Sequence, residues 1–290
     1  MRATPVFVVL VSGILATSAA AQGSVGWTYA MRITTDSGQG TTPSVMGMRQ
    51  LVRGNKLRME SSLAGAPAML EDAYSIFNGA DSTMTMVMPS EHSAMITPLG
   101  LAGAMRMQSM AVRSTNSDVV DLGAGESILG HPTHRYRVAS SGAVDITIGG
   151  HTCTKKMETV SEVWIAGDVD LEQATRAASQ TMKSFAPTVM IDQWYGTARS
   201  HLPPGTALRN VMTMQSYDAS GTAHPVKMTV EITELSHGEI ADSVFAIPAD
   251  YQSTDMREML KMVPAGMMDS ITKAQSSKMS SAMCDDVTKQ

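Results

Sequence analysis

The sequence has few aromatic residues and lacks the motifs that usually mark an active site. Aromatic residues make up 4% of the chain, whereas methionine occurs 26 times and takes over much of the filling of the core. There is no Gly-x-Ser-x-Gly elbow, since the segment Gly125-Glu126-Ser127-Ile128 lacks the second glycine. A glycine-rich phosphate loop, a His-Glu-x-x-His motif and a ladder of aspartates are also missing. We therefore predict a non-enzymatic protein without a cofactor.

Positive charge is also scarce. The formal net charge is −5, and it becomes −6 if residues 1–21, whose one charged residue is Arg2, are removed. Binding to nucleic acid depends on clustered Lys and Arg that neutralise phosphates. Attraction to an anionic membrane surface has the same requirement. The charge balance therefore argues against both kinds of partner.

No apolar run is long enough to cross a bilayer, which takes about 20 residues. The N-terminus instead has the parts of a signal peptide: the basic Arg2, the apolar run Val6–Leu15 and the small residues Ala19-Ala20-Ala21. We expect cleavage after residue 21 and a mature protein that is periplasmic or secreted. It would not be an integral membrane protein.

The chain contains only two cysteines, Cys153 and Cys284. In an oxidising compartment an even pair favours a disulfide. This one would tie the C-terminus to the middle of the domain. Two alternatives stay open: a thiol–metal site that includes His151, and two free thiols.

Alternating apolar residues predict a sheet. Gly26–Thr35 places Trp27, Tyr29, Met31 and Ile33 on one face. Turn residues between the following runs predict that the first hundred residues form an antiparallel meander. The later predicted strands are 135–138, 144–148, 158–166, 208–217 and 226–235, with residues 114–117 as a polar linker.

Helical patterns interrupt and follow this sheet. We expect a single β domain over residues 22–252, with helical insertions near 99–111 and 170–185. Residues 253–290 would form a helical tail, because Met256, Met259 and Met262 give its first part an apolar stripe. One pair of histidines, His131 and His134, flanks Pro132-Thr133, which prevents a regular helix from placing both on one face.

The stretch from Asp81 to Val112 is the best candidate for a ligand site. Its strand pattern points three thioethers to one face, and a possible lid follows. Unbranched, polarizable side chains adapt to ligands of varied shape, which suggests an apolar ligand. Thioethers also select Cu(I), and ordinary core filling is the third interpretation. The ligand-lining residues would be Met84, Met86, Met88, Met95, Leu101 and Met105, and the copper ligands Met84, Met86, Met88 and His92.

The methionines are spread along the chain and mixed with Ile, Leu and Val, and they do not form Met-x-x-Met groups with histidine. This distribution favours apolar lining over copper, because a Cu(I) site needs a few converging sulfurs. A third function is also open, in which an exposed sheet edge pairs with a cell-envelope protein.

The order of these elements resembles that of a bacterial family known as domain of unknown function 4412. The resemblance covers roughly residues 24 to 252 and rests on Ile128-x-Gly130, Trp164-Ile165-Ala166 and Phe245-x-Ile247-Pro248 with Tyr251. That family is similar to the periplasmic lipoprotein carriers and receptors of the LolA/LolB type.

The resemblance implies a mainly β (α+β) fold: a large unclosed antiparallel barrel whose concave apolar face is covered by helices. Together with the residues, it suggests an exported binding protein for a lipid or other apolar small molecule. Lipoprotein transport itself is not implied, because no functional residue of a carrier maps onto this chain.

Overall fold

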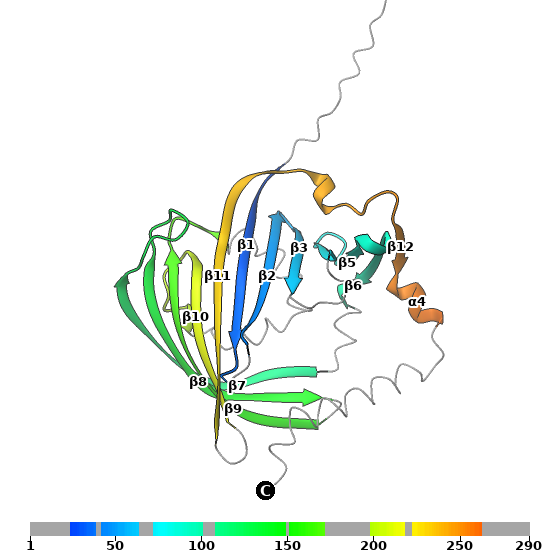
Figure 1. Ribbon diagram of the computed structural model, residues 1–290. Coiled ribbons are helices and arrows are strands. Elements are labelled where there is room, and N and C mark those ends of the chain that lie inside the picture. Colours follow the sequence, from blue (N-terminus) through cyan, green and yellow to red (C-terminus); the bar gives the residue numbers. More distant parts are fainter. Residues whose placement is uncertain are drawn as a thin grey trace, which may run out of the picture.

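The computed structural model describes residues 24–38, 42–63, 72–100, 108–148, 151–171, 198–217 and 222–262. These residues are mostly strands, as Figure 1 shows. The strands are β1 (Ser24–Asp36), β2 (Ser44–Arg53), β3 (Lys56–Leu63), β4 (Tyr74–Asn78), β5 (Thr83–Met88), β6 (Ser93–Pro98), β7 (Gln108–Ala124), β8 (His134–Ile148), β9 (His151–Ala166), β10 (Thr206–Tyr217), β11 (Ala223–Ile240) and β12 (Gln252–Asp255). The short helices are η2 (Pro89–Glu91), η3 (Asp242–Phe245) and α4 (Met256–Met262).

All twelve strands form one curved sheet in the order β12-β6-β5-β4-β3-β2-β1-β11-β10-β9-β8-β7. Strands β1 to β6 make one antiparallel meander and β7 to β11 make a second. The two meanders join where β1 pairs with β11. Strand β12 pairs in parallel with β6. Among the described residues β7 and β12 are the two edges, so the sheet is unclosed, and the predicted meander is confirmed.

The main hydrophobic cluster lies on the inner face of the sheet, toward one end of the strands. It includes Val52, Leu57, Phe77 and Met84 from β2 to β5, and Val169 and Leu171 from the segment after β9 also pack into it. Phe77 is 1% exposed, so this end is filled. We call the side chains of Val52, Leu57, Phe77, Met84 and Leu208 the closed end.

The outer face of β2 to β6 is covered by the chain that follows β11. Leu51, Ile76 and Val87 alternate with closed-end residues and therefore point the opposite way. They pack with Phe245 of η3, and with Tyr251 at the margin of the cluster. The sheet in this region is therefore buried on both faces.

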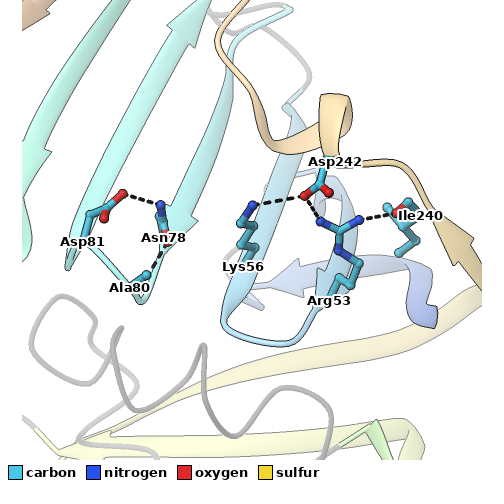
Figure 2. Close-up of polar contacts among 7 residues, drawn as sticks. All are labelled: Arg53, Lys56, Asn78, Ala80, Asp81, Ile240 and Asp242. Atoms are coloured by element: carbon cyan, nitrogen blue, oxygen red, sulfur yellow. Dashed lines mark hydrogen bonds and ion pairs between the residues drawn. The ribbon is translucent and has the colours of Figure 1, made fainter. Parts of the chain in front are cut away.

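Polar contacts fasten this cover to the hairpin between β2 and β3 (Figure 2). Arg53 is 8% exposed, donates to the Ile240 carbonyl at 2.5 Å and forms an ion pair with Asp242. Lys56 lies 3.2 Å from the same carboxylate. The two cations hold the pKa of Asp242 below its ordinary value, Lys56 having the larger effect. We call Arg53, Lys56 and Asp242 the clasp.

Several expectations about helices and linkers are wrong. Residues 108–124 form β7, so the end of the segment predicted as helical, including Met110, is a strand. Residues 114–117 belong to the same strand, and the Ser117 and Ser140 hydroxyls lie 2.9 Å apart across it. Pairing of this 17-residue strand with β8 overrides the local Gly, Ala and Ser composition. Residues 101–107 and 172–185 lie outside the described residues.

The part of the chain that the structure describes has no helices covering the sheet. Its one α-helix, α4, contacts β6 and β12 at the sheet edge. The predicted helical tail of residues 253–290 begins as a strand, because Gln252–Asp255 extends the sheet as β12. Residues 263–290 lie outside the described residues. No described helix is long and apolar enough to span a bilayer.

Candidate functional site

The methionines of the sheet all lie on its inner face. Directly paired residues share a face, and successive residues of a strand alternate between faces. Met31 pairs with Met48, Met86 with Met95, and Met212 with Met228, and these pairs are connected through the register of the strands between them. All twelve strand methionines with described side chains fall on this face: Met31, Met46, Met48, Met59, Met84, Met86, Met88, Met95, Met157, Met212, Met214 and Met228.

Eleven of these methionines are half-buried, and Met84, at 7% exposure, belongs to the closed end. Two of the eleven, Met31 and Met59, pack against the margin of the main hydrophobic cluster. We call the eleven the methionine face. They lie farther along the strands than the closed end, on eight strands from β6 across to β9. A row of half-buried thioethers presents a flexible apolar surface that adapts to the shape of a ligand.

A polar link joins the closed end to the methionine face. The Tyr29 hydroxyl donates to Gln50 Oε1 at 2.6 Å, and Gln50 Nε2 donates to the Met48 sulfur at 3.1 Å. Burial raises the pKa of Tyr29 to about 12. At neutral pH the tyrosine is therefore a neutral donor, and it fixes which end of the Gln50 amide faces the sulfur.

The predicted ligand residues divide into three groups. Met86, Met88 and Met95 lie on the methionine face at the β5–β6 edge region. Met84 is packed into the closed end. Leu101 and Met105 lie outside the described residues. The sequence pattern thus identified the face but missed the methionines of the other strands, whose positions depend on strand pairing.

The four residues predicted as copper ligands do not form one group. Met84 packs beside Phe77 at the start of β5. His92 follows η2 at the other end of the strand, with a positive φ of 46°, and its ring lies 5.3 Å from that of Tyr251. The strand between them separates the two residues by more than 13 Å, at about 3.3 Å per residue.

Cys153 is disulfide-bonded and 8% exposed. No thiolate is therefore available there for a metal, which removes the thiol–metal alternative. Cys284 lies outside the described residues, and the pairing of Cys153 with Cys284 stays a prediction.

The two histidines near Pro132 bind different carboxylates. His131 Nδ1 lies 2.8 Å from Asp168, and His134 Nε2 lies 2.5 Å from Asp121. The hydrogen bond to His131 lowers the pKa of Asp168, and hydrogen bonds from the Gly123 amide and then His134 lower that of Asp121. These are two separate contacts: the first lies between loop residues, and the second joins β7 to the start of β8. Among the described residues no three His, Cys, Asp or Glu side chains form a metal-binding group.

A pocket of about 380 Å³ lies mainly on the outer face, over β1 to β4. Three of its charged groups pair with one another: Arg58 donates to Glu60 at 2.8 Å and stacks 3.6 Å from the centre of the Tyr74 ring, while Arg49 lies 3.8 Å from Glu60. These contacts are structural, and we assign no chemistry to this pocket. The lining residues are Ala30, Met31, Gly47, Met48, Arg49, Arg58, Glu60, Ser61, Ser62, Asp72, Ala73 and Tyr74.

A family model described as domain of unknown function (DUF4412) matches residues 29–251. The chain belongs to this family. The match begins in β1 and ends just before β12, so it spans both meanders and the cover of the outer face. The resemblance inferred from the sequence is confirmed. Comparison with curated proteins finds no match.

Three solved structures match the chain at low similarity. PNGF-II has 12% identity and a TM-score of 0.32, over 81% of this chain and 33% of that one, so the chain spans about a third of its length. A DUF1329 family protein from Desulfovibrio piger has 10% identity and a TM-score of 0.26, over 77% and 90%. A putative outer membrane lipoprotein-sorting protein domain from Vibrio parahaemolyticus has 10% identity and a TM-score of 0.26, over 76% and 88%.

Proposed function

We propose that this DUF4412 protein is an exported binding protein that holds a lipid or another apolar small molecule against the methionine face. The observation that carries the proposal is the placement of eleven half-buried methionines on one face, beside a closed end that is already filled. A surface of this kind binds by shape and by burial of apolar area, not by reaction. The role is therefore non-enzymatic.

Export is supported by two independent features. Residues 1–21 have the pattern of a signal peptide, and Cys153 is disulfide-bonded. Disulfides persist in oxidising compartments such as the bacterial periplasm and are rare in the cytosol. We therefore place the mature protein in the periplasm or outside the cell.

The test compares one substitution on each face of β10. Met212→Glu puts a carboxylate on the methionine face, whereas Thr213→Glu puts the same group on the opposite face of the same strand. Delipidated protein is titrated with a fluorescent fatty acid, and native protein is examined for bound lipid by mass spectrometry. We expect Met212→Glu to weaken binding by about tenfold or more, or about 1.4 kcal/mol, and Thr213→Glu to leave it unchanged. Absence of both fatty-acid uptake and native lipid would refute the proposal.

A further inference from the structure

Nine residues of the methionine face fall into three groups with the same arrangement. In each group a Met-x-Met pair on one strand lies beside a third methionine on the neighbouring strand, directly opposite one member of the pair. The groups are Met46 and Met48 with Met31, Met86 and Met88 with Met95, and Met212 and Met214 with Met228. We call them the three methionine triads.

The spacing within a triad allows three sulfurs to meet. The Cβ atoms of directly opposite residues are about 4.5–5.5 Å apart. Residues two apart on a strand lie about 6.6 Å apart and point the same way. Each thioether sulfur is two bonds beyond its Cβ on an unbranched chain with three rotatable bonds. Three such chains can turn toward a point above the sheet between them.

Thioether sulfur is a soft ligand that selects Cu(I) over harder ions. We propose that each methionine triad is a binding site for one Cu(I) ion, held by sulfur alone. Imidazoles and carboxylates do not compete for this role in the described residues, because no three of them form a metal-binding group there. The proposed sites are therefore selective for a soft monovalent ion over Zn²⁺.

The side chains of the triads are partly exposed, as a site that takes up an ion from solvent requires. All nine methionines are half-buried, and one of them, Met31, also packs against the margin of the main hydrophobic cluster. Met84, which belongs to no triad, is buried in the closed end. In the first triad, Met48 already accepts a hydrogen bond from Gln50 Nε2 at 3.1 Å. Gln50 and Met46 lie on opposite sides of Met48 along β2, so this sulfur has to turn away from the amide to join a copper site.

The metal proposal and the apolar-ligand proposal use the same surface but depend on different properties of methionine. A Met→Leu substitution keeps the apolar area and nearly the same volume, and it removes the sulfur. Copper binding should therefore be lost in leucine variants that still bind a fatty acid. Each proposal can fail without the other.

The experiment is an anaerobic titration of the full-length mature protein with Cu(I), competed by a chromogenic Cu(I) chelator. Ascorbate keeps the copper reduced. We expect three equivalents to bind to the native protein. Replacement of one triad by three leucines should remove one equivalent, and the nine-leucine variant should bind none. Met157→Leu is the matched control, because Met157 lies opposite Ser216 and Gly142 and has no methionine partner there.

Several outcomes would overturn the proposal. These are binding of less than one equivalent, a stoichiometry that the triad variants do not change, or a loss as large in Met157→Leu. Equal binding of Zn²⁺ would contradict coordination by sulfur alone. X-ray absorption at the copper edge identifies the ligand atoms of the bound Cu(I) directly. Circular dichroism checks that each variant folds. If a triple variant does not fold, the single changes Met31→Leu, Met95→Leu and Met228→Leu should each lower Cu(I) affinity about tenfold or more at one site.

Discussion

The closed end and the methionine face are built on the same strands but from different side chains. On β5, Met84 is packed against Phe77 of β4, while Met86 and Met88 along the same strand are half-buried. Branched and aromatic side chains with well-defined rotamers specify one packing, whereas methionine tolerates many. One end of the sheet is therefore packed as a core, and the rest of the inner face has the adaptable side chains that the proposed binding role requires.

The largest expected effect is on the free energy of unfolding, which should depend more on the closed end than on the methionine face. Phe77→Ala should lower the free energy of unfolding by about 3–5 kcal/mol, because Phe77 is 1% exposed and its removal leaves a cavity. Met212→Ala, in the methionine face, should cost only about 1 kcal/mol, because a half-buried side chain loses less apolar burial. Urea denaturation measures both. Equal losses would mean that the methionine face is an ordinary core.

Removal of the disulfide tests whether the half of the sheet formed by β7 to β11 needs a covalent crosslink for stability, in addition to the packing of the closed end. Cys153 lies in β9, on the side of the sheet away from the β2–β5 cluster. Cys153→Ser should lower stability by about 2–4 kcal/mol, in a model where the crosslink restricts the unfolded chain. Thermal melts with and without a thiol reductant provide the comparison. Reductant should lower the midpoint of the native protein and leave that of the variant unchanged.

The clasp should make the closed end sensitive to acid. Lys56 and Arg53 lower the pKa of Asp242 below its ordinary value of 3.8. The stabilisation is therefore present above about pH 4, where the unfolded carboxyl is also ionised, and it is lost as the pH falls through the lower folded pKa. Asp242→Asn should be less stable at neutral pH and should lose this part of the acid dependence. Melting temperatures measured from pH 2 to pH 6 test the sign; an unchanged profile contradicts it.

The sequence predicted the strands better than their partners. Alternation alone placed Trp27, Tyr29 and Met31 on one face of a strand, and the structure agrees. Alternation does not reveal which strands are neighbours. Met31 and Met48 are 17 positions apart and lie directly opposite each other, so methionines that seem scattered in the sequence are grouped on the sheet.

The errors have a related cause. Strand β7 contains Ser114–Ser117, and within this run the Asn116 side chain is exposed and the Ser117 hydroxyl lies 2.9 Å from that of Ser140. Local composition indicated a linker there, but the pairing of this 17-residue strand with β8 decides the outcome. Tertiary pairing overrides weak local preference in strands more readily than in helices.

The smallest expected effect on stability comes from Tyr29, which lies between the closed end and the methionine face. Tyr29→Phe removes the hydroxyl that donates to Gln50 Oε1 at 2.6 Å, and it should cost about 1 kcal/mol of stability at neutral pH. Tyr29 has a folded pKa of about 12 against an ordinary 10.0, so an unfolded chain ionises first as the pH rises. Stability should therefore fall between pH 10 and 12 in the native protein, and less in the variant.

Ultraviolet difference titration of the phenolate, with Tyr29→Phe as the reference, isolates this group from the other tyrosines. A transition near pH 12 that the native protein shows and the variant lacks supports the burial that separates the closed end from the methionine face. A Tyr29 that ionises near pH 10 would show that water reaches the junction, and the two regions would then form one open surface. In that case the polar link through Gln50 to the Met48 sulfur could not hold a fixed orientation, since the hydroxyl that sets it would exchange its partner for water.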